Sequence, residues 1–187
     1  MQIEIGLDNV EKILHVADIH IRNFKRHKEY RQVFKKLYKD AKQLPKNSLI
    51  YVAGDIVHTK TDLSPELVEL TSEFFRNLAD IRPTIVITGN HDANLNNSSR
   101  LDALSPIINN LNHPNLHYLK DSGIYRVCDI DFIVMSVFDE PKDFPDATKA
   151  TGVKIGLHHG PVHNSVTDIV YVVNNESLKQ SVFTGCD

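Results

Sequence analysis

Four apolar, strand-like runs of the sequence are followed by side chains that can bind metal ions or move protons. These side chains are Asp18 and His20 after the first run, Asp55 and His58 after the second, Asn90, His91 and Asp92 after the third, and His158 and His159 after the fourth. Carboxylate, imidazole and amide groups are ligands that manganese and similar divalent cations accept, whereas soft metals prefer thiolates. The residue types therefore point to a site for a hard or borderline cation.

The spacing of these residues says how they could meet. Asp18 and His20 are two positions apart, so both side chains point to one side if the backbone is extended. The run 84–88 is rich in β-branched residues and does not alternate with polar ones, which indicates a strand buried on both faces. Gly89 would allow a sharp turn after it. Read alone, each motif is also compatible with an ordinary turn at a strand end, because Gly, Asn and Asp are common there.

The order of the elements favours convergence. Strands and helices alternate up to position 88, which is typical of parallel strands joined by right-handed crossovers. The carboxyl ends of such strands open onto one crevice, so the first seven candidate residues should meet there. We predict an α/β sandwich with mixed sheets and outer helices. Its expected strands are a run from 12, then 48–53, 84–88, 116–119, 124–127, 132–138, 153–157 and 169–173; its expected helices are 26–44, one that starts at 64–66, part of 100–111, and 176–183.

Length and composition set broad limits on the protein. A chain of 187 residues with 41% hydrophobic content suits one soluble domain, and we take 1–187 as that domain. No apolar run reaches the ~20 residues of a membrane span, and the start of the chain does not look like a secretory signal. Two widely spaced cysteines suggest reduced thiols in an intracellular protein, without excluding a disulfide.

Charge is distributed unevenly along the chain. The net charge is −3, but the segment 22–46 holds ten basic and two acidic residues. That segment is either the solvated face of a helix or a track for a phosphate backbone.

Taken together, the four motifs resemble a known family. Asp18-Ile-His20, Gly54-Asp55-Ile-Val-His58, Gly89-Asn90-His91-Asp92 and Leu157-His158-His159-Gly160 occur in the order of the calcineurin-like metallophosphoesterases. Within that superfamily the chain looks similar to the SbcD-like nucleases of recombination and repair, from Lys12 onward. The Gly-Asp-x-x-His form of the second motif, the helix start at 64–67 and the stretch 94–104 favour that branch.

The resemblance implies a fold and a site. The fold would be an α-β-β-α sandwich, and the site would hold two divalent cations, expected to be manganese. Asp18 and His20 would bind the first ion, Asn90 and His158 the second, and Asp55 would bridge them. Two ions ~3.5–4 Å apart can activate a shared water and clamp a phosphodiester.

The remaining motif residues would act on the substrate. His91 would stabilise the transition state or protonate the leaving 3′ oxygen, His58 would lie near the phosphate, and Asp92 would orient His91. His159 remains the alternative to His158 as a ligand.

The resemblance also implies an activity and partners. The chain would be the nuclease domain of a DNA exonuclease and endonuclease that works with an SMC-like ATPase and forms a homodimer. The family's later Gly-(His/Asp)-x-His motif does not occur before Asp187. We therefore expect a domain truncated before its last ligands, with weak manganese binding and little activity. Two other readings stay open: a phosphoesterase for a small-molecule or phosphoprotein substrate, and a non-catalytic docking module.

Overall fold

A computed structural model describes residues 1–97, 100–166, 171–176 and 178–187, in which the strands form two sheets. The first half of the chain contains β1 (Lys12–Val16), α1 (His27–Lys42), β2 (Ser48–Ala53), α2 (Pro65–Ile81), β3 (Thr84–Ile87), α3 (Ser105–Leu111) and β4 (Leu116–Tyr118). The second half contains β5 (Gly123–Val127), β6 (Ile130–Val134), β7 (Val153–Leu157) and the 3₁₀ segments η1 (Pro141–Asp143), η2 (Ala147–Lys149) and η3 (Gln180–Phe183). Among the described residues no helix has the length and apolar character needed to cross a membrane.

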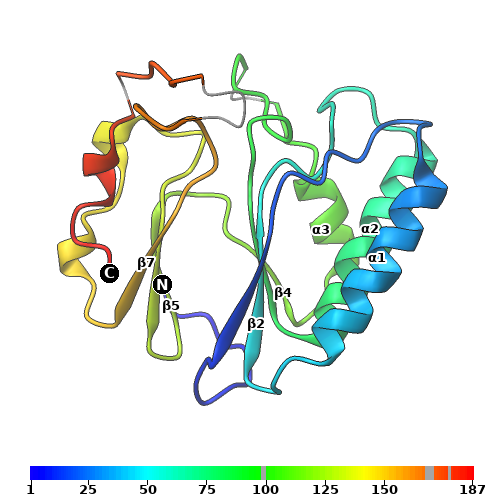
Figure 1. The fold of residues 1–187 in the computed structure, drawn as a ribbon, viewed down its shortest axis with the longest axis horizontal. Helices are drawn as coiled ribbons and strands as arrows, with labels where there is room; N and C mark the ends of the chain where they lie inside the picture. Colours follow the sequence, from blue (N-terminus) through cyan, green and yellow to red (C-terminus); the bar gives the residue numbers. More distant parts are fainter. Residues whose placement is uncertain (98–99, 167–170, 177) are drawn as a thin grey trace.

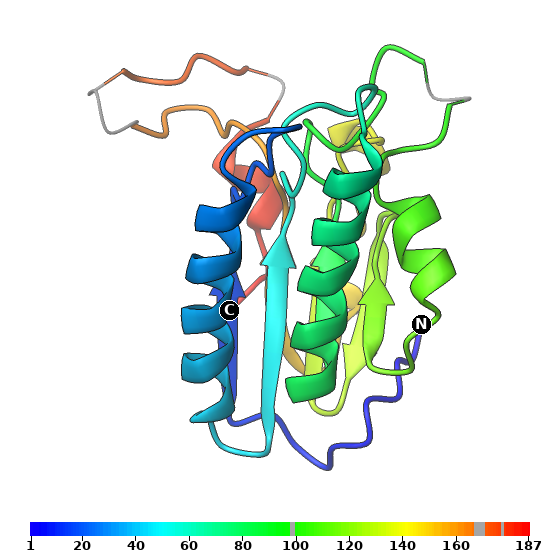
Figure 2. The same cartoon turned by 90° about the vertical axis from the view of Figure 1, so that its right-hand side faces the viewer.

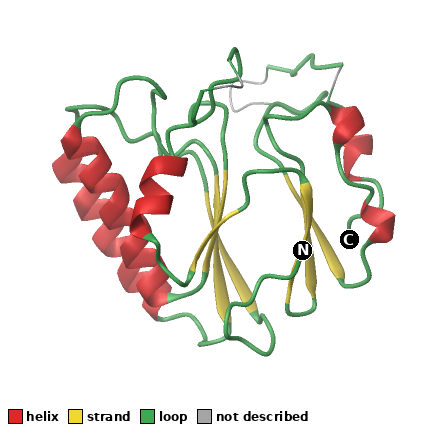
Figure 3. Ribbon diagram, turned by 180° about the vertical axis from the view of Figure 1, so that it is seen from behind, coloured by secondary structure: helices red, strands yellow, loops and turns green. Residues whose placement is uncertain are grey.

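The two sheets lie face to face, with helical segments outside each (Figures 1 and 3). Strands β1 to β4 are parallel and stand in sequence order, and α1, α2 and α3 cover their outer face. In the second sheet β5 pairs antiparallel with β6, and β6 pairs parallel with β7. The predicted α/β sandwich with mixed strand directions is therefore confirmed, although in the described parts of the chain the helical segments over its second outer face are 3₁₀.

Strand β2 shows how the sequence builds these layers. Its side chains alternate between two cores: Ile50 and Val52 face the helices, whereas Leu49 and Tyr51 face the second sheet. A strand with both faces buried needs apolar residues at every position, and all six residues of β2 are buried. Strand β6 alternates in the same way between the inter-sheet core and a third cluster beneath η2 and η3.

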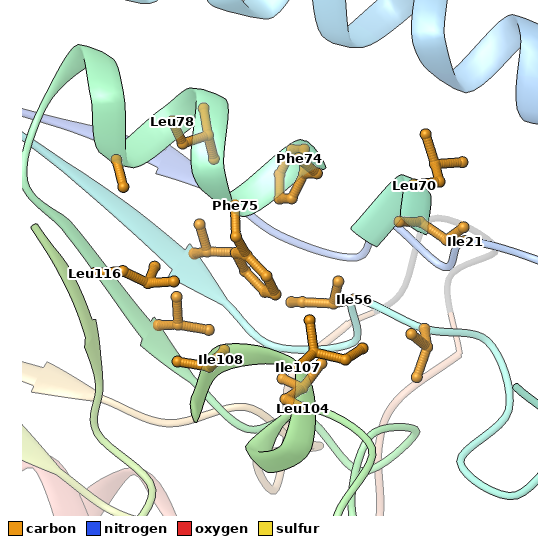
Figure 4. Close-up of a cluster of buried hydrophobic side chains, with 14 of the residues drawn as sticks. Ile21, Ile56, Leu70, Phe74, Phe75, Leu78, Leu104, Ile107, Ile108 and Leu116 are labelled. Carbon is orange, nitrogen blue, oxygen red and sulfur yellow. The ribbon is translucent and has the colours of Figure 1, made fainter. Parts of the chain in front are cut away.

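Helix α2 anchors the first half to its sheet. The hydroxyl of Ser64 accepts a hydrogen bond from the Leu67 N–H at 3.3 Å, and Pro65 occupies the first helical position, as the sequence predicts. Phe74 and Phe75 of this helix are fully buried and contact the sheet together with residues of α3 (Figure 4). The packing of α2 and α3 holds the carboxyl ends of β2 and β3 in fixed positions.

Several expected boundaries were wrong by a few residues. The expected second hairpin strand, 132–138, is β6 at Ile130–Val134, so the turn is shorter than predicted. The helix expected within 100–111 starts only at Ser105. The expected strand 169–173 lies partly outside the described residues, with Val172 bridged to Val166. The expected helix 176–183 includes position 177, which also lies outside them, and its described end is the 3₁₀ segment η3.

Candidate active site

Strands β1, β2 and β3 are parallel, so their carboxyl ends lie at one edge of the first sheet. In Figure 2 the cyan arrow of β2 points toward this edge. Beyond the strands, the His20 N–H donates to the Asp55 carbonyl at 2.9 Å and the Ile21 N–H donates to the Ile56 carbonyl at 2.8 Å. These bonds extend the pairing of β1 with β2 into the loops that carry the candidate residues. Asp18, His20 and Asp55 all have left-handed backbone, with φ of 53°, 49° and 52°. Such conformations are uncommon outside glycine and often mark functional loops.

Two glycines allow the loops after β2 and β3 to touch. Gly54 has a φ of +83°, and a side chain there would meet the backbone of Gly89 at 2.7 Å. A side chain at Gly89 would collide with the carboxylate and backbone of Asp55. Glycine at both positions therefore permits the close approach that sets Asp55 beside the loop of Asn90 and His91.

Asp92 links the loops after β2 and β3 through hydrogen bonds. Its side chain is fully buried and accepts hydrogen bonds from the N–H groups of Ile56, Val57 and Gly89, each at 3.0 Å at its closest. Burial outweighs these bonds and raises the pKa of Asp92 to about 7. Three backbone amides use the carboxylate, so Asp92 positions the loop that carries His91. Its predicted role of orienting His91 stays a prediction.

Three side chains that follow two other strands, β1 and β7, lie around Asp55. His159 Nε2 lies 3.2 Å from Asp55 Oδ2, and His20 Nε2 lies 3.5 Å from the same oxygen. His20 Nε2 is also 3.8 Å from Asp18 Oδ1. Ligand atoms of Asp18, Asp55 and His159 all lie within 4.8 Å of one another. The structure thus brings Asp18, His20 and Asp55 together as predicted, with a histidine from β7.

A second group of histidines adjoins the first. Ligand atoms of His20, His58 and His91 lie within 4.8 Å of one another, and the rings of His58 and His91 stack at 5.6 Å between centroids. His91 Nδ1 donates to the His58 carbonyl at 2.8 Å, because a carbonyl can only accept, and this leaves His91 Nε2 for other contacts. The main-chain N–H of His91 donates to Asp55 Oδ1 at 2.9 Å.

Comparisons with known proteins agree with this geometry. The family model described as "Calcineurin-like phosphoesterase" matches residues 11–183. The chain belongs to the calcineurin-like phosphoesterase family. It is also 47% identical over 190 residues to "Uncharacterized protein R555" of Acanthamoeba polyphaga mimivirus. That match covers 94% of this chain and 14% of the viral protein, so the chain spans about a seventh of the length of this relative.

The charge state of the cluster fits the divalent cations that calcineurin-like phosphoesterases bind. His159 Nδ1 donates to the Ala53 carbonyl at 2.5 Å, so a neutral ring would turn the lone pair of Nε2 toward a carboxylate oxygen of Asp55. Two hydrogen-bond acceptors 3.2 Å apart require a proton or a metal ion between them. Burial alone would lower the pKa of His159, but the hydrogen bond and charge of Asp55 raise it overall. A calcineurin-like phosphoesterase would replace that proton with the cation, held by Asp18, His20, Asp55 and His159.

The pKa of Asp55 changes in the direction that favours cation binding. Burial would raise it, but hydrogen bonds from the His159 ring and the His91 N–H lower it below its ordinary value. Only 5% of the Asp55 side chain is exposed, whereas 64% of the Asp18 side chain is. Asp55 is therefore a buried carboxylate at the centre of the cluster, suited to bind a cation, and Asp18 is its solvent-facing neighbour.

His158 occupies a different place from the one we expected. Its Nδ1 donates to the Met135 carbonyl at 2.7 Å, and its Nε2 lies against Gly160. Burial lowers the pKa of His158, so the ring stays neutral. In this structure His159, and not His158, lies beside Asp55, because β7 ends at Leu157 and the chain turns before the alternation of a strand can apply. The assignment of His158 as the metal ligand stays a prediction. Both histidines do line the same cavity of about 510 Å³.

Asn90 and His15 also line this cavity, and Lys60 contacts Asn90. Asn90 lines it beside His91, in the place predicted for a ligand of a second ion, which stays a prediction. His15 of β1 also lines it, although its position inside a strand gave no signal of this. The Lys60 ammonium group donates to the Asn90 carbonyl at 3.4 Å and brings a positive charge that the motifs did not predict.

Proposed function

We propose that this domain is a metal-dependent phosphodiesterase that cleaves DNA with two divalent cations, expected to be manganese. One observation carries the proposal: the cluster of Asp18, His20, Asp55 and His159 faces the pair His58 and His91 across a single shared residue, His20. Membership of the calcineurin-like phosphoesterases supports metal-dependent hydrolysis of a phosphoester.

Each group would have a distinct task. Bound divalent cations supply Lewis acidity, which neutralises phosphate charge and lowers the pKa of water. Asp55 would hold the cations from its buried position, with Asp18, His20 and His159 on one side and Asn90 on the other. The Ala53 carbonyl fixes the tautomer of His159 so that Nε2 faces the ligand position.

His91 would act on the substrate. The His58 carbonyl keeps the proton of a neutral His91 on Nδ1, so any proton that moves in the reaction is on Nε2. A protonated Nε2 could stabilise charge on the phosphoryl oxygens or protonate the leaving oxygen. Burial and the nearby positive charge of Arg22 lower the pKa of His58, which would make His58 a neutral hydrogen-bonding partner.

DNA is favoured over a small substrate by the position of the positive charge. Helix α1 carries most of the basic residues of segment 22–46, and its apolar side packs on the sheet through buried Phe34 and Ala41. Most of its basic residues are exposed, although Arg31 is paired with Glu69 and Glu73 of α2, and the first turn of the helix follows the loop that leads from His20. A small-molecule or phosphoprotein hydrolase, the second candidate, would have no use for such a surface.

The finer parts of the proposal rest on the resemblance to the SbcD-like branch. They are the choice of manganese, the recombination-repair role, the SMC-like ATPase partner and the homodimer. The mimivirus relative carries no functional description that would decide among them.

Calorimetric titration with Mn²⁺ and hydrolysis of bis(p-nitrophenyl) phosphate at high Mn²⁺ would test the proposal. We expect weak but measurable Mn²⁺ binding and hydrolysis, and the loss of both in Asp55→Asn. Asp40→Asn, which changes an exposed carboxylate of α1, is the matched control and should change neither. Binding without hydrolysis at any Mn²⁺ concentration would favour the non-catalytic module, and unchanged binding in Asp55→Asn would refute the site. Hydrolysis of bis(p-nitrophenyl) phosphate but not of a DNA strand would favour the small-molecule alternative.

A further inference from the structure

The loop between β1 and α1 holds an aromatic side chain out into solvent beside the candidate active site. Phe24 is 72% exposed and has a left-handed backbone with a φ of 53°. Exposing a phenylalanine forgoes the stabilisation that its burial would give, and a left-handed φ at a bulky residue adds strain. Neither feature is explained by packing, because the side chain is absent from each of the hydrophobic clusters found in the described residues.

The loop itself is firmly anchored. Ile21 is fully buried, bridges Val57, and accepts a hydrogen bond from the His58 N–H at 3.0 Å. The side-chain oxygen of Asn23 accepts a bond from the N–H of Ser64 at 3.1 Å. Phe24 directly follows these two anchors, so its outward position is imposed by the fold. Phe24 is four residues from His20 in sequence and three from Ile21, whose carbonyl accepts the bond from His58.

Positive charges surround the aromatic ring in sequence. Arg22, Lys25 and Arg26 are all exposed, and in the part of the chain that the structure describes, no ion pair involves Arg22 or Lys25. Arg26 lies 3.8 Å from Glu29, a loose pair between two exposed side chains. The charge of Arg22 reaches the active site, since it helps to lower the pKa of His58. Unpaired cations on both sides of an exposed aromatic ring are the combination that binds single-stranded nucleic acid.

We propose that Phe24 is a stacking platform for an unpaired base of the DNA strand whose phosphates lie along Arg22 and Lys25. The strand would pass from Phe24 over His58 to the cluster around Asp55, so an unpaired end or single-stranded segment is the preferred substrate. This inference rests on the proposed DNA phosphodiesterase. A dimer contact through Phe24 is disfavoured because two copies would bring their basic loops against each other.

Anisotropy titrations of the whole chain, with EDTA present, would test the stacking. The probes are a fluorescein-labelled oligothymidine and a strand of equal length made of abasic sites. We expect the oligothymidine to bind more tightly, and Phe24→Ala to weaken it about 10-fold, which corresponds to about 1.4 kcal/mol. The same variant should leave the abasic strand unchanged, and Phe24→Trp should restore base-dependent affinity. Val153→Ala, which alters an exposed apolar residue of β7, is the control and should bind both strands normally.

Two further variants separate phosphate contacts from base contacts. Arg22→Gln and Lys25→Gln should weaken both strands alike, and each should reduce the slope of log affinity against log salt by ~0.7. Equal binding of both strands by the wild-type chain, or equal losses in Phe24→Ala with an unchanged thermal melting curve, would overturn the stacking. Failure of the proposed function is distinguishable, since it would appear as absent hydrolysis of bis(p-nitrophenyl) phosphate while base-dependent binding persisted.

Discussion

The two halves of the domain contribute to the site in different ways. The first half, residues 12–118, delivers Asp18, Asp55 and Asn90 from the ends of three adjacent parallel strands, each of which is followed by a helix that packs on the same face. The second half, residues 123–187, contributes the adjacent pair His158 and His159 after one strand. The first half therefore supplies candidate residues from three strand ends, and the second half adds a pair from one strand end.

The halves also differ in how they are held together. The helices and the sheet of the first half share one large core. The second half is covered by short 3₁₀ segments over a small cluster, and a buried carboxylate, Asp131, fastens its hairpin to the loop before β7. The strands of the second half also share the inter-sheet core with β2 and β3, so it is on its outer face that the second half depends more on single polar contacts.

Replacing His91, which belongs to the first half, should have the largest effect, and the effect is on the rate of hydrolysis. We expect His91→Gln to slow phosphodiester hydrolysis by ~10²–10⁴-fold while Mn²⁺ binding stays unchanged, because its task is in the transition state. Steady-state rates and calorimetry on the same samples would check this. His113→Gln, which alters a histidine paired with exposed Asp80, should leave both quantities intact. Loss of Mn²⁺ binding in His91→Gln would show instead that His91 is a ligand.

The contribution of the second half is tested by a matched pair of histidines. His159→Gln should weaken Mn²⁺ binding by at least ~10–100-fold, because a ligand is lost where even supporting contacts have that effect. His158→Gln should change it less, since the Nε2 of His158 faces Gly160 and not Asp55. Calorimetry of the two variants side by side decides the matter, and the reverse order would restore the original assignment to His158.

Sequence periodicity was sufficient for the long apolar strands and insufficient at the ends of several other elements. Strands β2 and β7 have the predicted bounds because long apolar runs between polar residues define them. Convergence of Asp18, His20 and Asp55 also followed from parallel topology. The stated reason for pairing Asp18 with His20 was incomplete, however. Both residues have left-handed φ, so the rule for extended backbone does not apply to them.

The partners of Asp92 and the choice between His158 and His159 could not be predicted from the sequence, for one shared reason. The partners of Asp92 are backbone amides of two loops, and no side-chain pattern reports where such amides point. The choice between His158 and His159 depends on the turn after Leu157, which one residue of alternation cannot predict. The types of residue in the sequence identified the site, whereas the role of each residue depended on the backbone conformation of the loops.

Asp131 offers a sharper test of how the second half is held. Its side chain is 4% exposed and accepts bonds from Arg126 Nε at 2.7 Å and from the N–H groups of Thr151 at 2.9 Å and Gly152 at 2.8 Å. We expect Asp131→Asn to lower the free energy of unfolding by about 2–4 kcal/mol at neutral pH, because Arg126 and two amides lose a charged acceptor. Urea unfolding would measure it, with exposed Asp8→Asn as the control.

The pH dependence of this effect has a defined sign. The hydrogen bonds from Arg126 hold the pKa of Asp131 well below its usual range, with help from the N–H groups of Gly152 and Thr151. A lowered carboxyl pKa stabilises the fold fully above the unfolded value of ~3.9, and the stabilisation falls as pH drops below it. The difference between wild type and Asp131→Asn should therefore shrink below about pH 4. A difference that stayed constant down to acid pH would contradict the role assigned to the carboxylate.

The smallest expected effect concerns the N-terminal cap of α2. In the first half, stability is spread over regular helices and strands. Ser64→Ala removes the acceptor for the Leu67 N–H and should lower the free energy of unfolding by about 1 kcal/mol, less than Asp131→Asn. Ser64→Asp should retain the cap, and Ser72→Ala, within the same helix, is the matched control. The main-chain N–H of Ser64 still reaches Asn23, so the loop before α1 should keep its place. A loss in Ser64→Ala as large as that in Asp131→Asn would mean that both halves rely on single polar contacts, and the contrast between them would fail.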